Sequence, residues 1–147
     1  MDKIQSVRGT KDIFPIEMIK YNSVIDKARS VSKLFGFDEA SFPLIEKSQV
    51  FTRPLGESSD VVSKETYSFD DRGGDSITLR PEGTAGIIRA VLSEGKLNNL
   101  PLKYFYSGPM FRYERPQKGR LRQFTQIGIE SIGNPNAIED VEVILCG

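Results

Sequence analysis

A pair of long strand-like stretches limits what this 147-residue chain can fold into more than any other feature of its sequence. The stretches cover residues 103–113 and 121–132, and a short charged segment, residues 114–120, joins them. Strands joined by a hairpin-type loop form an antiparallel pair. Pro109 lies within the first stretch and cannot donate to a ladder, so we expect a bulge or a sheet edge there.

Helical patterns surround this pair. From Ile16 to Phe35 the apolar residues recur with a period of 3.6, and Pro15 and Gly36 fit the start and the stop of a helix. Thr84 fits the N-cap of a second helix, which ends near Gly95. Both segments therefore predict amphipathic helices.

Shorter elements are expected between the two helices. Residues 42–45 form an extended piece, because Pro43 biases Phe42 away from helical angles. Residues 52–76 are rich in Ser, Asp, Glu and Gly and predict a loop around a short strand at 66–69. A hairpin turn at 71–75 then leads into a strand at 76–79.

The last segment predicts a third helix, opened by a capping box of Asn136 and Glu139. The helices are segregated from the strands along the chain, which is typical of an α+β fold. We therefore expect an antiparallel sheet flanked by helices.

Composition excludes several classes of protein. The chain has no histidine and one cysteine, Cys146, which rules out a disulfide-stapled fold, catalytic triads and most zinc sites. No apolar run is long enough to span a membrane, and the N-terminus lacks the apolar core of a signal peptide. We therefore expect a soluble, cytoplasmic domain without a membrane partner.

The net charge is zero, but cations are concentrated in one segment. Residues 112–122 hold five cations and one anion, which suggests an anionic ligand. Arginines that converge on one pocket suit polyphosphate, because their planar forks bind oxygens bidentately. The other interpretation of Arg112 and Arg120 is surface ion pairing with Glu114.

Side chains alternate between the two faces of a strand, so each long stretch divides into two sets. One face of the second stretch carries Arg122, Phe124, Gln126, Gly128 and Glu130, and the more apolar opposite face should pack on helices. Gly128 would leave a hollow floored by backbone, which suits a small polar ligand. A solvent-exposed polar face with a glycine at a bulge explains the same pattern. In the preceding stretch, one face carries Tyr104, Tyr106, Gly108, Met110 and Arg112.

A turn just before the second predicted helix presents two further candidates. Pro81 and Gly83 fix this turn, and Glu82 and Thr84 lie on it. Glu82 can bind an ammonium group, and Thr84 can bind an amide or an amine. Helix capping by Thr84 needs no ligand and is the alternative explanation.

These segments resemble a known family. Residues 111–124, within a motif spanning about 103–132, closely resemble motif 2 of class II aminoacyl-tRNA synthetases. Residues 79–86 and 126–130 resemble the histidyl-tRNA synthetases specifically. Residues from about 20 to 46 resemble motif 1, the dimer interface of that class.

The resemblance covers essentially the whole chain and implies an incomplete class II catalytic core. Residues 1–147 would be its N-terminal portion, with motif 3 and the anticodon-binding domain absent, so we expect little or no charging activity from this chain alone. The implied reaction is ATP-dependent activation of histidine to histidyl-adenylate, followed by transfer to histidine tRNA. ATP with Mg²⁺ is the implied cofactor, and the full-length protein would be a homodimer.

The resemblance also implies a role for each matching residue. Arg112 would be catalytic and contact the α-phosphate, Glu114 and Arg120 would hold ATP, and Phe124 would stack on adenine. The residues implied for histidine are Glu82, Thr84 and Gln126 at its amino-acid end and Glu130 at its imidazole. No residue is expected to ligate a metal.

Two other functions remain open at this point. A non-catalytic, histidine-sensing regulatory paralogue of the histidine biosynthesis pathway would keep the fold but relax the ATP-binding loop. The intact run of residues 112–115 and the turn at 82–84 favour the synthetase. A single-stranded RNA binder would use the loop at 115–122 together with Phe124, and its affinity would depend steeply on salt.

Overall fold

The computed structural model describes residues 3–55, 65–115, 117 and 119–147, and within them it forms two three-stranded sheets. The first sheet has the order β1-β5-β6, with strands at Asp38–Glu39, Leu102–Phe111 and Gln123–Ile132. The second has the order β2-β4-β3, with β2 at Ile45–Lys47, β3 at Tyr67–Asp70 and β4 at Ser76–Leu79. The helices are α1 at Pro15–Leu34, α2 at Gln49–Leu55, α4 at Thr84–Ser93 and α5 at Ala137–Cys146, with a 3₁₀ turn at Lys96–Asn99.

The long antiparallel pair is confirmed. Strands β5 and β6 pair in one unbroken register, from Leu102 opposite Ile132 to Phe111 opposite Gln123. The short strand β1 joins the other side of β5 in the parallel direction. The α+β class is therefore confirmed, although this sheet is mixed rather than wholly antiparallel.

Pro109 lies in a part of β5 that pairs with β6 but not with β1, so the side of β5 away from β6 is a sheet edge there, as one of the two expectations had it. The register shows no bulge. The Pro109 carbonyl accepts a hydrogen bond from Nε of Arg80 at 3.0 Å, and the Phe111 N–H donates to the Arg80 carbonyl at 3.0 Å. Backbone groups of alternate residues in a strand point to the same side. The donor that Pro109 lacks would therefore face Arg80, so the ladder with β6 loses nothing.

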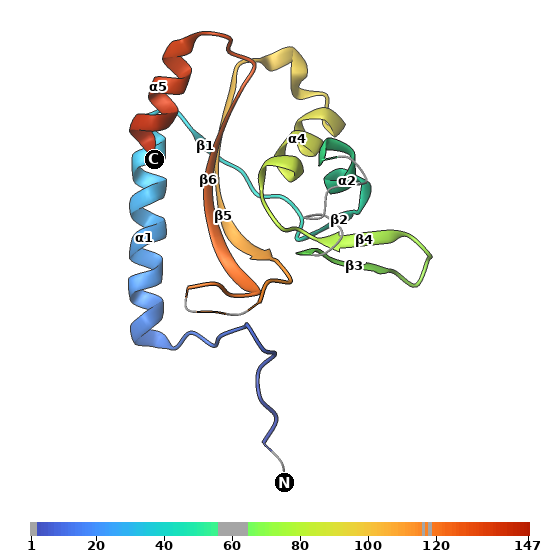
Figure 1. The fold of residues 1–147 in the computed structure, drawn as a ribbon. Helices are drawn as coiled ribbons and strands as arrows, with labels where there is room; N and C mark the ends of the chain where they lie inside the picture. The colour runs from blue at the N-terminus through green and yellow to red at the C-terminus, as the bar shows by residue number, and fades with distance from the viewer. Residues whose placement is uncertain (1–2, 56–64, 116, 118) are drawn as a thin grey trace.

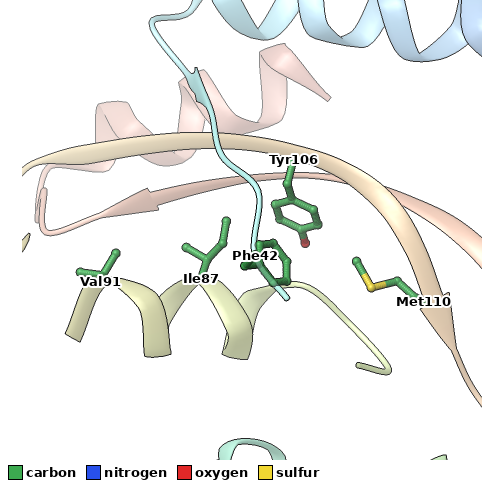
Figure 2. Packing of buried hydrophobic residues seen from close by; sticks show 5 residues of the cluster. All are labelled: Phe42, Ile87, Val91, Tyr106 and Met110. Atoms are coloured by element: carbon green, nitrogen blue, oxygen red, sulfur yellow. The ribbon is translucent and has the colours of Figure 1, made fainter. Parts of the chain in front are cut away.

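Helices cover both faces of the β5–β6 pair, with α1 and α5 on one side and α4 on the other (Figure 1). On the α1 side, the hydroxyl groups of Tyr21 and Thr125 are hydrogen-bonded. This contact confirms that the face carrying Thr125 packs on a helix. On the α4 side, a core cluster joins α4, β5 and the segment between β1 and β2 (Figure 2). It consists of Phe42, Ile87, Val91, Tyr106 and Met110.

Helix α1 matches its predicted boundaries, with Pro15 in the first turn and Gly36 at φ +78° just after the end. Its apolar stripe is less buried than the periodicity implies, because Val24 is 61% exposed and Ser32 alone is buried along the helix. Periodicity predicted the helix correctly without showing how much of its apolar surface this chain covers.

Helix α4 begins where predicted, but Thr84 is not its N-cap. The N-cap residue is Gly83, and the Glu82 carboxylate accepts the N–H groups of Thr84 at 2.6 Å and Ala85 at 3.0 Å. Glu82 has the longer side chain and precedes the helix, so its two oxygens reach both free amides. The helix ends as expected before Gly95, whose φ is +64°.

Helix α5 is confirmed, but the prediction of a capping box at its start is wrong. The Asn136 side chain makes no cap hydrogen bond. Glu139 instead accepts from the Ser131 hydroxyl and from the Asn134 amide, both at 2.7 Å, and lies 3.4 Å from the Lys103 ammonium. The hydrogen bond from Ser131, with those from Asn134 and Lys103, lowers the pKa of Glu139. These contacts tie α5 to the sheet rather than close its first turn.

The region predicted as a loop is partly helical, since α2 extends to Leu55. Residues 56–64 of that loop lie outside the described residues. The hairpin is confirmed, and its turn is closed by Asp71, whose carboxylate accepts the N–H groups of Gly73 and Asp75. The extended piece predicted at 42–45 becomes a strand only from Ile45 onward. Among the described helices, none is both long and apolar enough to cross a membrane.

Candidate functional site

The register of the β5–β6 pair brings the two polar strand faces together. Tyr106 lies opposite Gly128, and Gly108 lies opposite Gln126. Tyr104 lies opposite Glu130 in the same way. Residues paired across two strands share a face of the sheet. The candidate side chains of the two strands therefore form one surface beside helix α4.

The start of α4 completes one end of this surface. The Thr84 hydroxyl donates a hydrogen bond to Oε1 of Glu130 at 2.7 Å, across 46 residues of sequence. Glu82 lies on the same turn, where its carboxylate caps the helix. Two carboxylates and a hydroxyl thus meet at this end of the site. Such an acceptor-rich group suits a ligand that carries N–H donors.

Gln126 supplies another acceptor to the same surface. Its Oε1 atom is buried and has no hydrogen-bond partner among the described residues. A buried acceptor without a partner is costly, and native structures contain few of them. A ligand donor at this position would pair the oxygen.

The hollow expected over Gly128 is filled by Tyr106. A Cβ atom added at Gly128 would lie 2.3 Å from Cζ of Tyr106, and one added at Gly83 would lie 2.2 Å from the same atom. The Tyr106 ring therefore occupies a slot between two glycines, and the residue is 2% exposed. Burial raises the pKa of Tyr106 to about 12, with the negative charges of Glu130 and Glu82 adding to the effect.

Sequence reasoning placed Tyr106 on the correct face but gave it no role. Its place opposite Gly128 leaves room for the aromatic ring to lie across the neighbouring strand, but this place depends on the strand register, which side-chain alternation alone does not give. The approach of Gly83 comes from tertiary packing, so strand alternation could not show it.

A second cluster lies at the other end of the surface. The Arg112 guanidinium lies 5.0 Å from the ring centroid of Phe124, and its Nε donates to the Pro81 carbonyl at 2.8 Å. Glu114 lies between two arginines, 4.0 Å from Nη1 of Arg112 and 3.5 Å from Nη1 of Arg120. The structure therefore brings together all four residues expected at ATP. The ion pairs with Glu114 are also present, and the Arg120 side chain stays 64% exposed.

Arg122 supports this cluster from beside it. Its guanidinium lies 4.1 Å from the ring centroid of Tyr113, and its Nε donates to the Glu114 carbonyl at 3.3 Å. Two residues of the connecting loop, Pro116 and Lys118, lie outside the described residues.

A cavity of about 1560 Å³ lies next to the site, mainly between α2, α4 and the turn that precedes α4. Glu82, Thr84 and Arg112 are among its lining residues, and the apolar side chains of Val50 and Ile88 form part of its wall. Phe124, Gln126 and Glu130 do not line this cavity. The described residues contain no cluster of three or more His, Cys, Asp or Glu side chains that could hold a metal ion.

Comparison with known proteins decides the family. A family profile described as Histidyl-tRNA synthetase matches residues 9–146. The chain belongs to the histidyl-tRNA synthetase family. Among curated members, it is 56% identical to the histidine--tRNA ligase of Rhodospirillum rubrum and 54% identical to that of Gluconacetobacter diazotrophicus, each over the whole chain. It spans about a third of the length of these relatives, 35% in both cases.

Solved structures of histidyl-tRNA synthetases share the fold. Apo histidyl-tRNA synthetase of S. aureus is 35% identical, with a TM-score of 0.80, and the match covers 98% of this chain and 33% of that one. A Bacillus halodurans protein described as an ATP phosphoribosyltransferase regulatory subunit/histidyl-tRNA synthetase is 26% identical, with a TM-score of 0.83. That match covers 99% of this chain and 37% of the other. These likenesses confirm the class II catalytic fold within the histidyl-tRNA synthetase family.

Proposed function

We propose that this chain carries the histidine-recognising part, and a share of the ATP-binding part, of a histidine--tRNA ligase. The reaction is ATP-dependent activation of histidine to histidyl-adenylate, followed by transfer to histidine tRNA in the cytoplasm. The observation that carries the proposal is the buried Oε1 of Gln126, which has no partner in the described part of the chain and lies on the sheet face where Thr84 contacts Glu130. An α-ammonium group is a compact donor that pairs such an oxygen.

Histidine fits the acceptors at this end of the site. Its ammonium group has three N–H donors, and oxygen atoms of Gln126, Glu82 and Thr84 can each accept a hydrogen bond from it. Thr84 uses its hydrogen for Glu130 and retains oxygen lone pairs for the ligand. The Glu130 carboxylate then accepts the imidazole N–H. A ligand without that N–H would leave the carboxylate unpaired, which gives strong discrimination.

ATP fits the arginine cluster. The histidine carboxylate attacks the α-phosphorus, an O–P bond forms, and pyrophosphate leaves with the electrons of the broken P–O bond. Arg112 neutralises the charge that develops on the α-phosphate, so no side-chain nucleophile is needed. Glu114 and Arg120 hold ATP, and Phe124 stacks on adenine. Mg²⁺ would enter with the ATP phosphates and neutralise part of their charge.

Dimer formation is part of the proposal. Helix α1 leaves large apolar side chains uncovered, with Ile16 79% and Ile19 70% exposed. This helix belongs to the segment that resembles motif 1, and a second copy would cover these side chains.

The regulatory function is the second candidate, because the Bacillus halodurans neighbour is described both as a regulatory subunit and as a histidyl-tRNA synthetase. The assembled cluster of Arg112, Glu114, Arg120 and Phe124 favours the ligase, since a histidine sensor needs no site for ATP.

A ligand panel tests the proposal. Thermal unfolding and titration calorimetry are measured with histidine, with ATP and with a dozen other amino acids. A ligand at about 100 times its dissociation constant stabilises the fold by about 2.7 kcal/mol. We expect stabilisation by histidine alone among the amino acids, and by ATP. Histidine binding without ATP binding favours the regulatory function, and no response to histidine contradicts the proposal.

A further inference from the structure

The Tyr106 ring is enclosed by glycines from two different elements. The slot is closed by Gly83 from the turn before α4 and by Gly128 from β6, and no side chain larger than hydrogen fits at either position without moving the ring. Phe42 adds an edge-to-face contact, with ring centroids 5.4 Å apart and planes at 78° (Figure 2). The ring is therefore enclosed on both faces of its slot and contacts Phe42 as well.

From this position the hydroxyl reaches the carboxylate expected to bind the imidazole. The Tyr106 Oη atom lies 3.4 Å from Oε1 of Glu130 and donates to it. The Thr84 hydroxyl donates to the same oxygen at 2.7 Å. Two donors therefore act on Oε1, and no hydrogen bond to Oε2 of Glu130 is found among the described residues.

We propose that Tyr106 is a positioning residue for histidine specificity. Together with Thr84, it fixes Oε1 of Glu130 and leaves Oε2 as the acceptor for the imidazole N–H. This inference rests on the proposed function and extends it to a residue that does not itself contact the ligand.

The protonation state of Tyr106 agrees with this role. Its pKa of about 12 keeps the hydroxyl protonated at neutral pH, so toward an ionised carboxylate it acts only as a donor. A carboxylate that is already oriented binds its ligand without first losing rotational freedom. Removing the Tyr106 hydroxyl should therefore affect ligands that use Oε2 and spare those that do not.

The test compares histidine with β-(2-thienyl)alanine, an amino acid whose five-membered ring has no N–H. Dissociation constants for both are measured by calorimetry on the whole chain and on Tyr106→Phe, which keeps the ring in its slot. The matched control is Tyr21→Phe, which loses a hydroxyl contact on the opposite face of β6. The quantity compared is the ratio of the two dissociation constants, since a general loosening of the site weakens both ligands alike.

In Tyr106→Phe we expect the preference for histidine to fall about fivefold, and in Tyr21→Phe we expect no change. An unchanged ratio in Tyr106→Phe overturns the inference and leaves the proposed function intact. A wild-type chain without any preference for histidine overturns the proposed function itself. Should Tyr106→Phe fail to fold, Tyr106→Leu also removes the hydroxyl donor to Oε1, and the ratio of the two dissociation constants is compared in the same way, with an unchanged ratio again overturning the inference.

Discussion

Glu130→Ala is expected to weaken histidine binding by about 100-fold, the largest effect on binding that the site predicts. The substitution removes the acceptor of the imidazole N–H. It also leaves the hydroxyls of Thr84 and Tyr106 without the oxygen to which both donate. Histidine would then enter a partly buried site with its ring N–H unpaired.

Titration calorimetry on the whole chain measures this effect. β-(2-Thienyl)alanine should bind Glu130→Ala within about threefold of its wild-type affinity, because it offers no N–H to the carboxylate. Glu142→Ala is the matched control, since Glu142 pairs with Lys103 where α5 meets the sheet. Equal losses for the two ligands would show that Glu130 supports the structure rather than recognises the ring.

Gly128→Ala is expected to destabilise the fold by about 3 kcal/mol, because the new methyl group would overlap a buried ring. Its Cβ would lie 2.3 Å from Cζ and 2.4 Å from Oη of Tyr106. Gly83 closes the other side of the ring, so the ring cannot move away from the methyl group. Denaturant unfolding gives the free energy of unfolding of each variant.

A double-mutant cycle identifies the cause of this loss. Tyr106→Leu removes the ring atoms that a Cβ at Gly128 would meet. In that background Gly128→Ala should cost less than about 1 kcal/mol, so the coupling energy should exceed about 2 kcal/mol. An equal cost in both backgrounds would mean that the glycine is required for a reason other than Tyr106.

The strands and their faces could be predicted from the sequence because they depend on short-range pattern. Side-chain alternation and the short connection between two long stretches determine which residues share a face. The faces carrying Arg112 and Gln126 were therefore found before their register was known. Helix α1 was predicted for the same reason, from periodicity and from Pro15 and Gly36.

The parts that sequence reasoning missed depend on contacts between distant segments. The filling of the space over Gly128 requires Tyr106 from another strand and Gly83 from a turn. The capping of α4 by Glu82 depends on how the turn before the helix folds back. The Thr84 hydroxyl was expected to cap α4, but in the structure it donates a hydrogen bond to Glu130 instead.

The most direct test of the central proposal locates bound histidine by amide NMR on the isotope-labelled chain. We predict that histidine shifts the amide signals of Thr84 and Ala85 and those of residues 126–130, where the acceptors lie. Signals near Asn134 and Glu139, at the junction of β6 and α5, should stay unchanged. Shifts confined to that junction, or no shifts at saturating histidine, would contradict a histidine site formed by α4 and β6.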